Sequence, residues 1–442
     1  GKGNQVKLAG EISKFSAQPD FRLNLQEAVF NLKEILELAG NPVKPATVDG
    51  ILKLANLEVN GHLQNSQPEM IAISKGSIAI DSFSANYPQS AAKIEGARLA
   101  VDLQDIKLEN LALRQVSAQS SLTVSKTVFK DITVSNFNQQ LRVNAEGSGP
   151  MVTKLVFSTV AGNVEYLHPQ WGKLGSGLRM EGTAEGDLSA GDLNQFKVKL
   201  GSGSFLNASL QGKIEDFGKK DFQIDPSLNL DIDAFLRVLP PEIMKPLGMT
   251  LNRGIAEINA HIQGTLDDKY QMQSTKGKAD LSLKEVDFQL GKPAIGAKSF
   301  TLQASFPLEY SPAKGIKIPV IDLNSRFVKI KALDNWEIGP AELRSRLTSQ
   351  QFFSLTKDPG IVPLNYQVAL ALASIQSGKP EVKLAKLALE ASLRGDFVPA
   401  DKDVRNITLT GDMSVDNIEG LQKYKTGKAR TVFTVDIHDR TL

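Results

Sequence analysis

The sequence of 442 residues predicts a mostly β fold, an elongated and curled antiparallel sheet that carries two short amphipathic helices. Aliphatic and polar residues alternate repeatedly, as at Leu99, Val101 and Leu103 and again at Leu281 and Leu283. Successive side chains of a strand point to opposite faces, so these segments predict strands with one apolar and one polar face. Turn-forming residues recur roughly every 8–15 residues from about position 50 to position 440, which is typical of an all-β body.

The curl is predicted from places where the aliphatic pattern slips by one residue. After Leu103, strict alternation would place the next aliphatic residue at position 105, but it stands at Ile106. After Leu283 it would stand at position 285, but it stands at Val286. The intervening pairs 104–105 (Gln, Asp) and 284–285 (Lys, Glu) are poor residues for a two-residue hairpin turn. We therefore expect β-bulges at these places, which keep the apolar face continuous while bending the sheet.

Two segments have helical instead of strand spacing. Apolar residues recur at helical intervals over 26–39, and a second such segment covers 234–245. Each follows a strand that reads Leu-Asn-Leu, which suggests related modules. We expect a β-rich module over 1–150, connecting strands over 151–200, and a second β-rich module over 201–442 with its strand-helix unit near 228–248.

Glycine marks both the predicted turns and the predicted strand ends. The predicted turns are Asn60-Gly61, Lys75-Gly76, Glu95-Gly96 and the segments 147–150, 172–177, 201–203, 252–254 and 377–380. Several strands are predicted to end in glycine, a polar residue and an aliphatic residue, at Gly61, Gly186, Gly212, Gly264, Gly395 and Gly411. Glycine inside a strand indicates a bulge, a bend or a close approach of two backbones.

Composition argues against several classes of function. The formal net charge is +2, without a basic run that could follow a phosphate backbone, so nucleic acid is not expected as a partner. Cysteine is absent, and the four histidines lie far apart without metal-ligand spacing, so we expect no enzyme, no metal site and no cofactor. No apolar stretch is long enough to span a membrane, and the first residues do not form a signal peptide. The chain reads as a soluble piece of a larger protein whose anchor lies elsewhere.

The segments 228–242 and 254–266, together with the repeated glycine-polar-aliphatic strand ends, resemble the AsmA-like family of Gram-negative envelope proteins, whose relatives include TamB and YhdP. The resemblance is best over about residues 176–290 and loose elsewhere. It implies a U-shaped β-groove with an apolar interior, a periplasmic location, an inner-membrane anchor outside this chain, and movement of phospholipid toward the outer membrane. An outer-membrane protein is a further possible partner.

These observations give two hypotheses of function. The first is a lipid-transfer conduit or outer-membrane biogenesis factor, in which inward aliphatic side chains hold lipid tails at about 0.8 kcal/mol per buried methylene. The expected lining residues are Leu99, Val101, Leu103, Leu281, Leu283, Val286, Phe288 and Leu290. The alternative is a structural or interaction protein, a closed β-solenoid or sandwich stalk such as an adhesin or assembly scaffold, whose apolar faces pack on each other.

Overall fold

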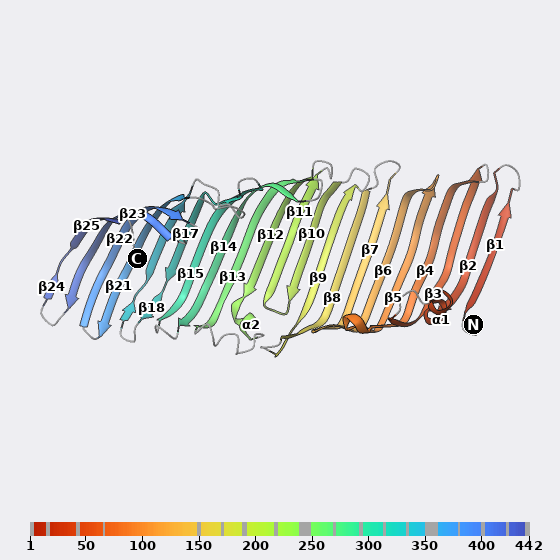
Figure 1. Ribbon diagram of the computed structural model, residues 1–442, viewed down its shortest axis with the longest axis horizontal. Coiled ribbons are helices and arrows are strands. Elements are labelled where there is room, and N and C mark those ends of the chain that lie inside the picture. The colour runs from red at the N-terminus through yellow and green to blue at the C-terminus, as the bar shows by residue number, and fades with distance from the viewer. Residues whose placement is uncertain are drawn as a thin grey trace. The chain divides into compact units, whose positions relative to one another are not determined.

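The structure is a computed structural model, and it is almost entirely antiparallel β (Figure 1). It describes the chain except for residues 1–3, 15–17, 41–44, 65–66, 148–151, 169–171, 188–191, 216–219, 238–248, 268–270, 291–294, 313–314, 333–335, 350–360, 379–380, 399–402, 421–423 and 438–442. The described residues contain two α-helices and one short 3₁₀ helix, η1 (Pro88–Ser90). The predicted fold class, a curled and mostly antiparallel β-sheet with two short helices, is therefore confirmed.

The chain divides into two compact units, each described here by itself. Unit 1 is Gly1–Gly203 with Ser209–Gly218, and unit 2 is Ser204–Ala208 with Lys219–Leu442. The predicted connecting strands over 151–200 fall within unit 1, and unit 2 begins close to the start predicted for the second module at 201.

In unit 1 each strand pairs antiparallel with the next, from β1 through β10. Most of these strands are much longer than the spacing of the sequence turn signals suggests. The strands are β1 (Gln5–Ser13), β2 (Asp20–Asn31), β3 (Thr47–Gln64), β4 (Gln67–Tyr87), β5 (Ala92–Glu109), β6 (Ala112–Phe129), β7 (Ile132–Glu146), β8 (Val152–His168), β9 (Gly172–Asp187), β10 (Asp192–Ser202) and β11 (Leu206–Glu215), the last shared with unit 2.

Unit 2 follows the same plan, with three positions filled by shorter strands in line. The place of one long strand is taken by β16, β17 and β18 together, by β19 with β20, and by β24 with β25. The strands are β12 (Asp221–Asp231), β13 (Met249–Leu266), β14 (Met272–Leu290), β15 (Ile295–Ser311), β16 (Gly315–Lys317), β17 (Val320–Phe327), β18 (Lys329–Ala332), β19 (Trp336–Ile338), β20 (Ala341–Thr348), β21 (Val362–Gly378), β22 (Glu381–Val398), β23 (Asp403–Gly420), β24 (Tyr424–Thr426) and β25 (Ala429–Ile437).

The first helix is shorter than predicted, and the second begins earlier than predicted. Helix α1 is Leu32–Leu38, so the first part of the predicted helix over 26–39 is instead the end of strand β2. Helix α2 is Ile232–Leu236, earlier than the predicted 234–245, of which residues 238–245 lie outside the described residues. Each helix begins where a side-chain oxygen of the preceding strand's last residue accepts a backbone N–H, Asn31 for α1 and Asp231 for α2. The strand pairing continues up to the capping residue. Residues before the cap are therefore in a strand, although their apolar residues have helical spacing.

In unit 1 a line of irregular residues crosses neighbouring strands at matching positions, and we call it the unit 1 bend line. It consists of Gly50, Ser82, Gly96, Ser125, Asn136, Gly162, Gly177 and Gly203. Ser82, Gly96 and Asn136 have positive φ of 53°, 60° and 54°, a conformation found at bulges that bend a strand. Glu95-Gly96 is thus a bulge inside β5, and the prediction of a turn there was wrong.

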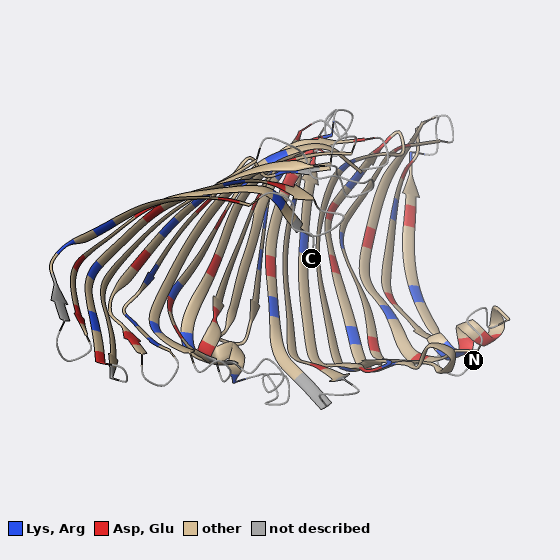
Figure 2. Ribbon diagram, turned by 60° about the vertical axis from the view of Figure 1, so that its left-hand side comes forward, with Lys and Arg blue, Asp and Glu red and all other residues tan. Residues whose placement is uncertain are grey.

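In unit 2 a similar line of irregular residues crosses neighbouring strands, and we call it the unit 2 bend line. It consists of Gly254, Glu285, Ser299, Val328, Gly339, Ala373, Lys386, Asp416 and Gly427. Glu285 has φ of 51° and the register shifts beside it, so the bulge predicted at 284–285 is confirmed. The bulge predicted at 104–105 in unit 1 is confirmed in the same way, because Asp105 has φ of 47°. The strands change direction along their length in both units (Figure 2).

The most buried apolar side chains lie beside these bend lines and are mostly small. They are Ala85, Ala97, Val124 and Ala161 in unit 1 and Val286, Ala297, Ala341 and Val415 in unit 2. All face the same side of the sheet as the aliphatic rows beside them. A bend crowds side chains on its inner side, so small residues are required there. The apolar face is therefore the inner side of the bends.

The glycines predicted at strand ends mostly lie there, at Gly61, Gly186, Gly212, Gly264 and Gly395, while Gly411 lies in the middle of β23, contrary to the prediction. A Cβ on Gly264 would come within 2.1 Å of the Ser274 carbonyl oxygen, so only glycine fits. The predicted turns at Asn60-Gly61, Lys75-Gly76, 172–177 and 252–254 also lie inside strands, whereas those at 147–150, 201–203 and 377–380 lie at the ends of β7, β10 and β21. Glycine in this chain serves close backbone approach and bending more often than chain reversal.

Candidate functional site: a continuous apolar face

Each unit presents one face built from aliphatic rows that run across the strands. In unit 1 the row containing Leu99 is Phe30, Leu52, Ile80, Leu99, Leu122, Gln139, Thr159, Met180 and Leu200. In unit 2 the row containing Leu283 is Leu230, Ala256, Leu283, Leu302, Ser325, Leu343, Leu370, Leu389, Met413 and Thr431. Antiparallel register preserves the face of each side chain, so the local alternation becomes a continuous apolar surface.

This face has no second layer packed on it among the described residues. Ile258 and Leu178, which belong to it, are 42% and 37% exposed. The accessible surface of the chain is 27266 Å² for a mass of 47.9 kDa. One compact body of this mass exposes about 16,000 Å², and two separate bodies of half the mass expose about 20,000 Å² together. The accessible surface of the chain exceeds both of these areas, whatever the arrangement of the units. A sheet of a single layer exposes this much surface because neither of its faces is covered.

The predicted lining residues fall into two groups. Leu99, Val101 and Leu103 lie together on the apolar face of β5, and all are partly exposed. In β14, Leu281 and Leu283 are also partly exposed on that face.

Two of the remaining predicted lining residues lie at the unit 2 bend line. Val286 is only 4% exposed and packs under Gly254 at the unit 2 bend line. Phe288 stacks edge-on against Phe300 with ring centroids 6.0 Å apart. The side chain of Leu290 lies outside the described residues. Sequence alternation does not distinguish an aliphatic residue that lines a surface from one that fills a bend.

The opposite face is polar and carries cross-strand ion pairs. Acidic and basic positions are interspersed along the strands (Figure 2). Asp81 on β4 lies between Lys53 on β3, with Nζ 2.8 Å from Oδ2, and Arg98 on β5, with Nε 3.0 Å from Oδ1. The hydrogen bond from Lys53, reinforced by the Arg98 guanidinium, holds the pKa of Asp81 below its ordinary value of 3.8. Neighbouring strands are thus matched in charge on one face and in apolar character on the other.

We expect acid to weaken unit 1 through this group. A carboxyl whose pKa is lowered by folding stabilises the fold above its unfolded pKa, and this contribution disappears as the pH falls through the folded pKa. Asp81→Asn should cost about 0.5–1 kcal/mol at pH 7, because the side chain is partly exposed, and should cost nothing near pH 2. Chemical denaturation at both pH values measures this, with Asp102→Asn, an exposed residue of the same face, as the control. An equal loss for Asp81→Asn at both pH values would contradict the interpretation.

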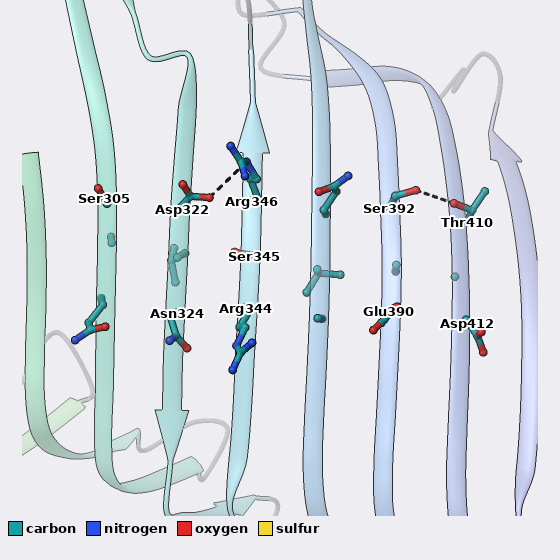
Figure 3. A pocket seen from close by; sticks show the side chains of 18 of the residues that line it. Ser305, Asp322, Asn324, Arg344, Ser345, Arg346, Glu390, Ser392, Thr410 and Asp412 are labelled. Atoms are coloured by element: carbon teal, nitrogen blue, oxygen red, sulfur yellow. Dashed lines mark hydrogen bonds and ion pairs between the residues drawn. The ribbon is translucent and has the colours of Figure 1, made fainter. Parts of the chain in front are cut away.

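A depression of about 1050 Å³ crosses unit 2 from β14 to β25 (Figure 3). It takes three successive residues from each strand, such as 322–324 of β17 and 344–346 of β20. The outer two of each triplet are mostly polar and share one face, whereas the middle row contains Leu281, Ala304 and Val368. Leu302 and Leu343, the nearest side chains along the apolar face, do not line it, so the depression lies against the polar face.

Polar side chains of this depression bond to one another or to nearby side chains of the same sheet. The Oδ1 atom of Asp322 lies 3.6 Å from Nε of Arg346, and the hydroxyl oxygens of Ser392 and Thr410 are 2.7 Å apart (Figure 3). Arg344 pairs with Glu342 of its own strand. These are the contacts of a hydrated sheet surface, and they converge on no single point.

Chemistry-bearing residues do not gather elsewhere in the described part of the chain. His62 lies between Asp20, at 2.7 Å, and Glu69, at 3.5 Å, and His261 pairs with Asp225. The side chain of His168 and all of His438 lie outside the described residues. Within the described ranges no group of three or more His, Asp or Glu side chains could hold a metal ion, and no helix is long and apolar enough to cross a membrane.

Comparisons with protein-family models, with curated proteins and with solved structures found no match to this chain.

Proposed function

We propose that this chain is a lipid-transfer conduit of the cell envelope, a periplasmic factor that carries phospholipid tails along its apolar β-face between the inner and outer membranes. The observation that carries the proposal is the continuous aliphatic face, partly exposed in both units and without a second layer among the described residues. Soluble monomers rarely leave apolar patches of this extent open to water, and such a patch marks a surface for an apolar partner.

The chemistry of the face suits an acyl chain. A tail of about 16 methylenes laid along aliphatic side chains escapes water at about 0.8 kcal/mol per methylene. The rows around Leu283 and Leu99 contain few polar side chains that could fix an acyl chain at one position. Binding is therefore strong in total and weak at each site, which permits sliding. The resemblance to the AsmA-like family implies the same role and supports the proposal. The proposal includes a membrane anchor outside this chain and a partner protein in the outer membrane.

The alternative class, a closed sandwich or solenoid stalk, needs a dry core. Inward side chains such as Leu281 and Leu283 would then be nearly fully buried against a facing layer, whereas they are partly exposed. Among the described residues only Val362 is a large side chain with essentially no exposure. The partial exposure of these side chains thus favours an open apolar face over a closed core.

We expect the purified chain to retain phospholipid. Organic extraction followed by mass spectrometry should recover several phospholipid molecules per chain after purification from bacterial cells without detergent. The control is the same extraction of a soluble globular protein of similar size purified in parallel, which should yield background lipid only. If folded and monodisperse protein contains no more lipid than that control, the conduit proposal is contradicted and the alternative, a structural or interaction protein, is favoured.

A further inference from the structure

The apolar face of unit 1 ends, at one margin of the sheet, in a row of large side chains. This is the margin that carries η1 and helix α1 (Figure 1). Strand pairing joins one residue from each of the strands β4 to β8 into the row, which consists of Tyr87, Ala92, Phe129, Ile132 and Tyr166. We call this row the aromatic margin. Ala85, two residues before Tyr87, is buried on the apolar face, so the paired residues of the row lie on that face too.

The large side chains of the aromatic margin are open to water. Tyr87, Phe129, Ile132 and Tyr166 are 42%, 47%, 41% and 40% exposed. Each of the strands β4 to β8 has a paired strand on both sides, so this exposure does not depend on either end of the chain. At about 4.8 Å per strand, the row is roughly 20 Å long. Single exposed apolar residues are ordinary, whereas a contiguous row indicates a contact surface.

Aromatic exposure is confined to this row. Among the described residues, Tyr87, Phe129 and Tyr166 are the only aromatic side chains that are exposed. At the opposite margin the same five strands begin or end in residues of which none is aromatic, namely Gln67, Glu109, Ala112, Glu146 and Val152. The two margins of the same strands therefore present different chemistry to the surroundings.

A basic side chain lies beside the row. Lys130 and Asp131 form the turn between β6 and β7, and Nζ of Lys130 lies 5.6 Å from the centroid of the Phe129 ring. Lys130 is exposed and makes no ion pair with any residue that the structure describes. The turn is held in place by backbone hydrogen bonds, from Lys130 to Ala91 and from Leu167 to Asp131. An ammonium group is thus fixed next to the exposed rings.

We propose that unit 1 lies against the surface of a phospholipid bilayer through the aromatic margin. Phe129 and Ile132 enter the boundary between headgroups and acyl chains. The rings of Tyr87 and Tyr166 lie at headgroup depth, where a side chain with an apolar body and a polar tip is favoured. The ammonium of Lys130 contacts lipid phosphate.

The size of the row favours a bilayer over a protein partner. Four side chains of about 200 Å², each about 40% exposed, offer roughly 300 Å², well below the ~800 Å² per partner of a stable protein interface. A fluid bilayer needs no matching surface, because its lipids adapt to each inserted side chain. The inference goes beyond the carriage of lipid tails along the apolar face and does not depend on it.

The first test is flotation of the chain with vesicles of phosphatidylethanolamine and phosphatidylglycerol. The wild-type chain should float with the vesicles. Phe129→Gln combined with Tyr166→Gln should weaken vesicle binding roughly tenfold or more, because two rings no longer leave water. Lys130→Gln should weaken it about fivefold through the loss of one charge at the anionic surface. Leu111→Asn is the matched control, since Leu111 is 68% exposed in the turn at the opposite margin, and it should bind as the wild type does.

The second test shows which margin meets the bilayer while every side chain of the row is kept. The chain has no cysteine, so Asp131→Cys and Leu111→Cys each give one attachment point for a nitrobenzoxadiazole dye, whose emission rises in apolar surroundings. Emission should rise on addition of the vesicles at position 131 and stay constant at position 111. Circular dichroism verifies the sheet in each variant, and if the double ring variant loses it, the dye measurement decides.

Three results would each overturn the proposal. They are a wild-type chain that does not float with the vesicles, a folded double ring variant that binds as tightly as the wild type or the Leu111→Asn control, and a dye at position 111 that responds as strongly as the dye at position 131. The first of these would leave the aromatic margin to a protein partner.

Discussion

Leu283→Asp is expected to lower the number of phospholipid molecules retained per chain, by loss of those bound around this position in unit 2, while the protein stays folded. Leu283 belongs to the apolar row of unit 2 and is partly exposed, so without lipid the new carboxylate remains hydrated and the strand ladder is unaffected. With lipid present, the carboxylate must lose water against hydrocarbon, a cost of several kcal/mol that corresponds to about a hundredfold or more in affinity. The measurement is phospholipid per chain after extraction, beside the thermal melting midpoint.

Gln303→Asp is the matched control for this variant. Gln303 lies on the neighbouring strand β15, opposite Ser282 on the polar face, and is exposed. It should keep both lipid and stability. Phe288→Asp is a less informative variant, because Phe288 packs on Phe300 in the bend and its loss lowers stability directly. The conduit proposal fails if Leu283→Asp retains as much lipid per chain as the wild type, and the open face itself is contradicted if this variant unfolds.

Gly254→Val should be among the most destabilising single substitutions in unit 2. Gly254 has φ of +142°, a conformation that side chains with a Cβ rarely adopt. A Cβ there would lie 2.7 Å from Cγ2 and 3.1 Å from Cα of Val286, which is itself nearly fully buried. Backbone strain and overpacking each cost about 1–3 kcal/mol, so a loss of about 2–6 kcal/mol is expected.

Gly296→Ala supplies the comparison for Gly254→Val. Gly296 lies in the adjoining strand β15, and its nearest neighbour to an added Cβ is the Phe288 carbonyl oxygen at 3.7 Å. This substitution should change stability by less than about 1 kcal/mol, since ordinary contact distance and ordinary φ impose no strain. Urea unfolding of both variants measures the difference. Similar stabilities for the two would show that the unit 2 bend line is not the constraint inferred here.

Much of this fold follows from sequence because the signal is local. Alternation at Leu99, Val101 and Leu103 fixes a strand and its two faces, since side-chain direction depends only on position along the chain. The bulge at Glu285 was also predictable, because a one-residue slip must be absorbed if the apolar face is to stay on one side. Fold class, the polar and apolar faces, and these bulges were therefore determined by the sequence itself.

What the tertiary structure decided depends on residues far apart in the chain. Val286 and Leu283 look alike in the pattern, yet the bend line buries Val286 and leaves Leu283 partly exposed. The path of the bend line is set by matching irregularities in neighbouring strands. Glycines such as Gly96 signal a turn locally, but cross-strand pairing on both sides keeps β5 continuous through the bulge. The start of α1 is likewise delayed because β3 pairs with β2 up to Asn31, and β1 pairs with it up to Val29. Periodicity determines which face a side chain occupies, and strand pairing determines whether that face is packed or open.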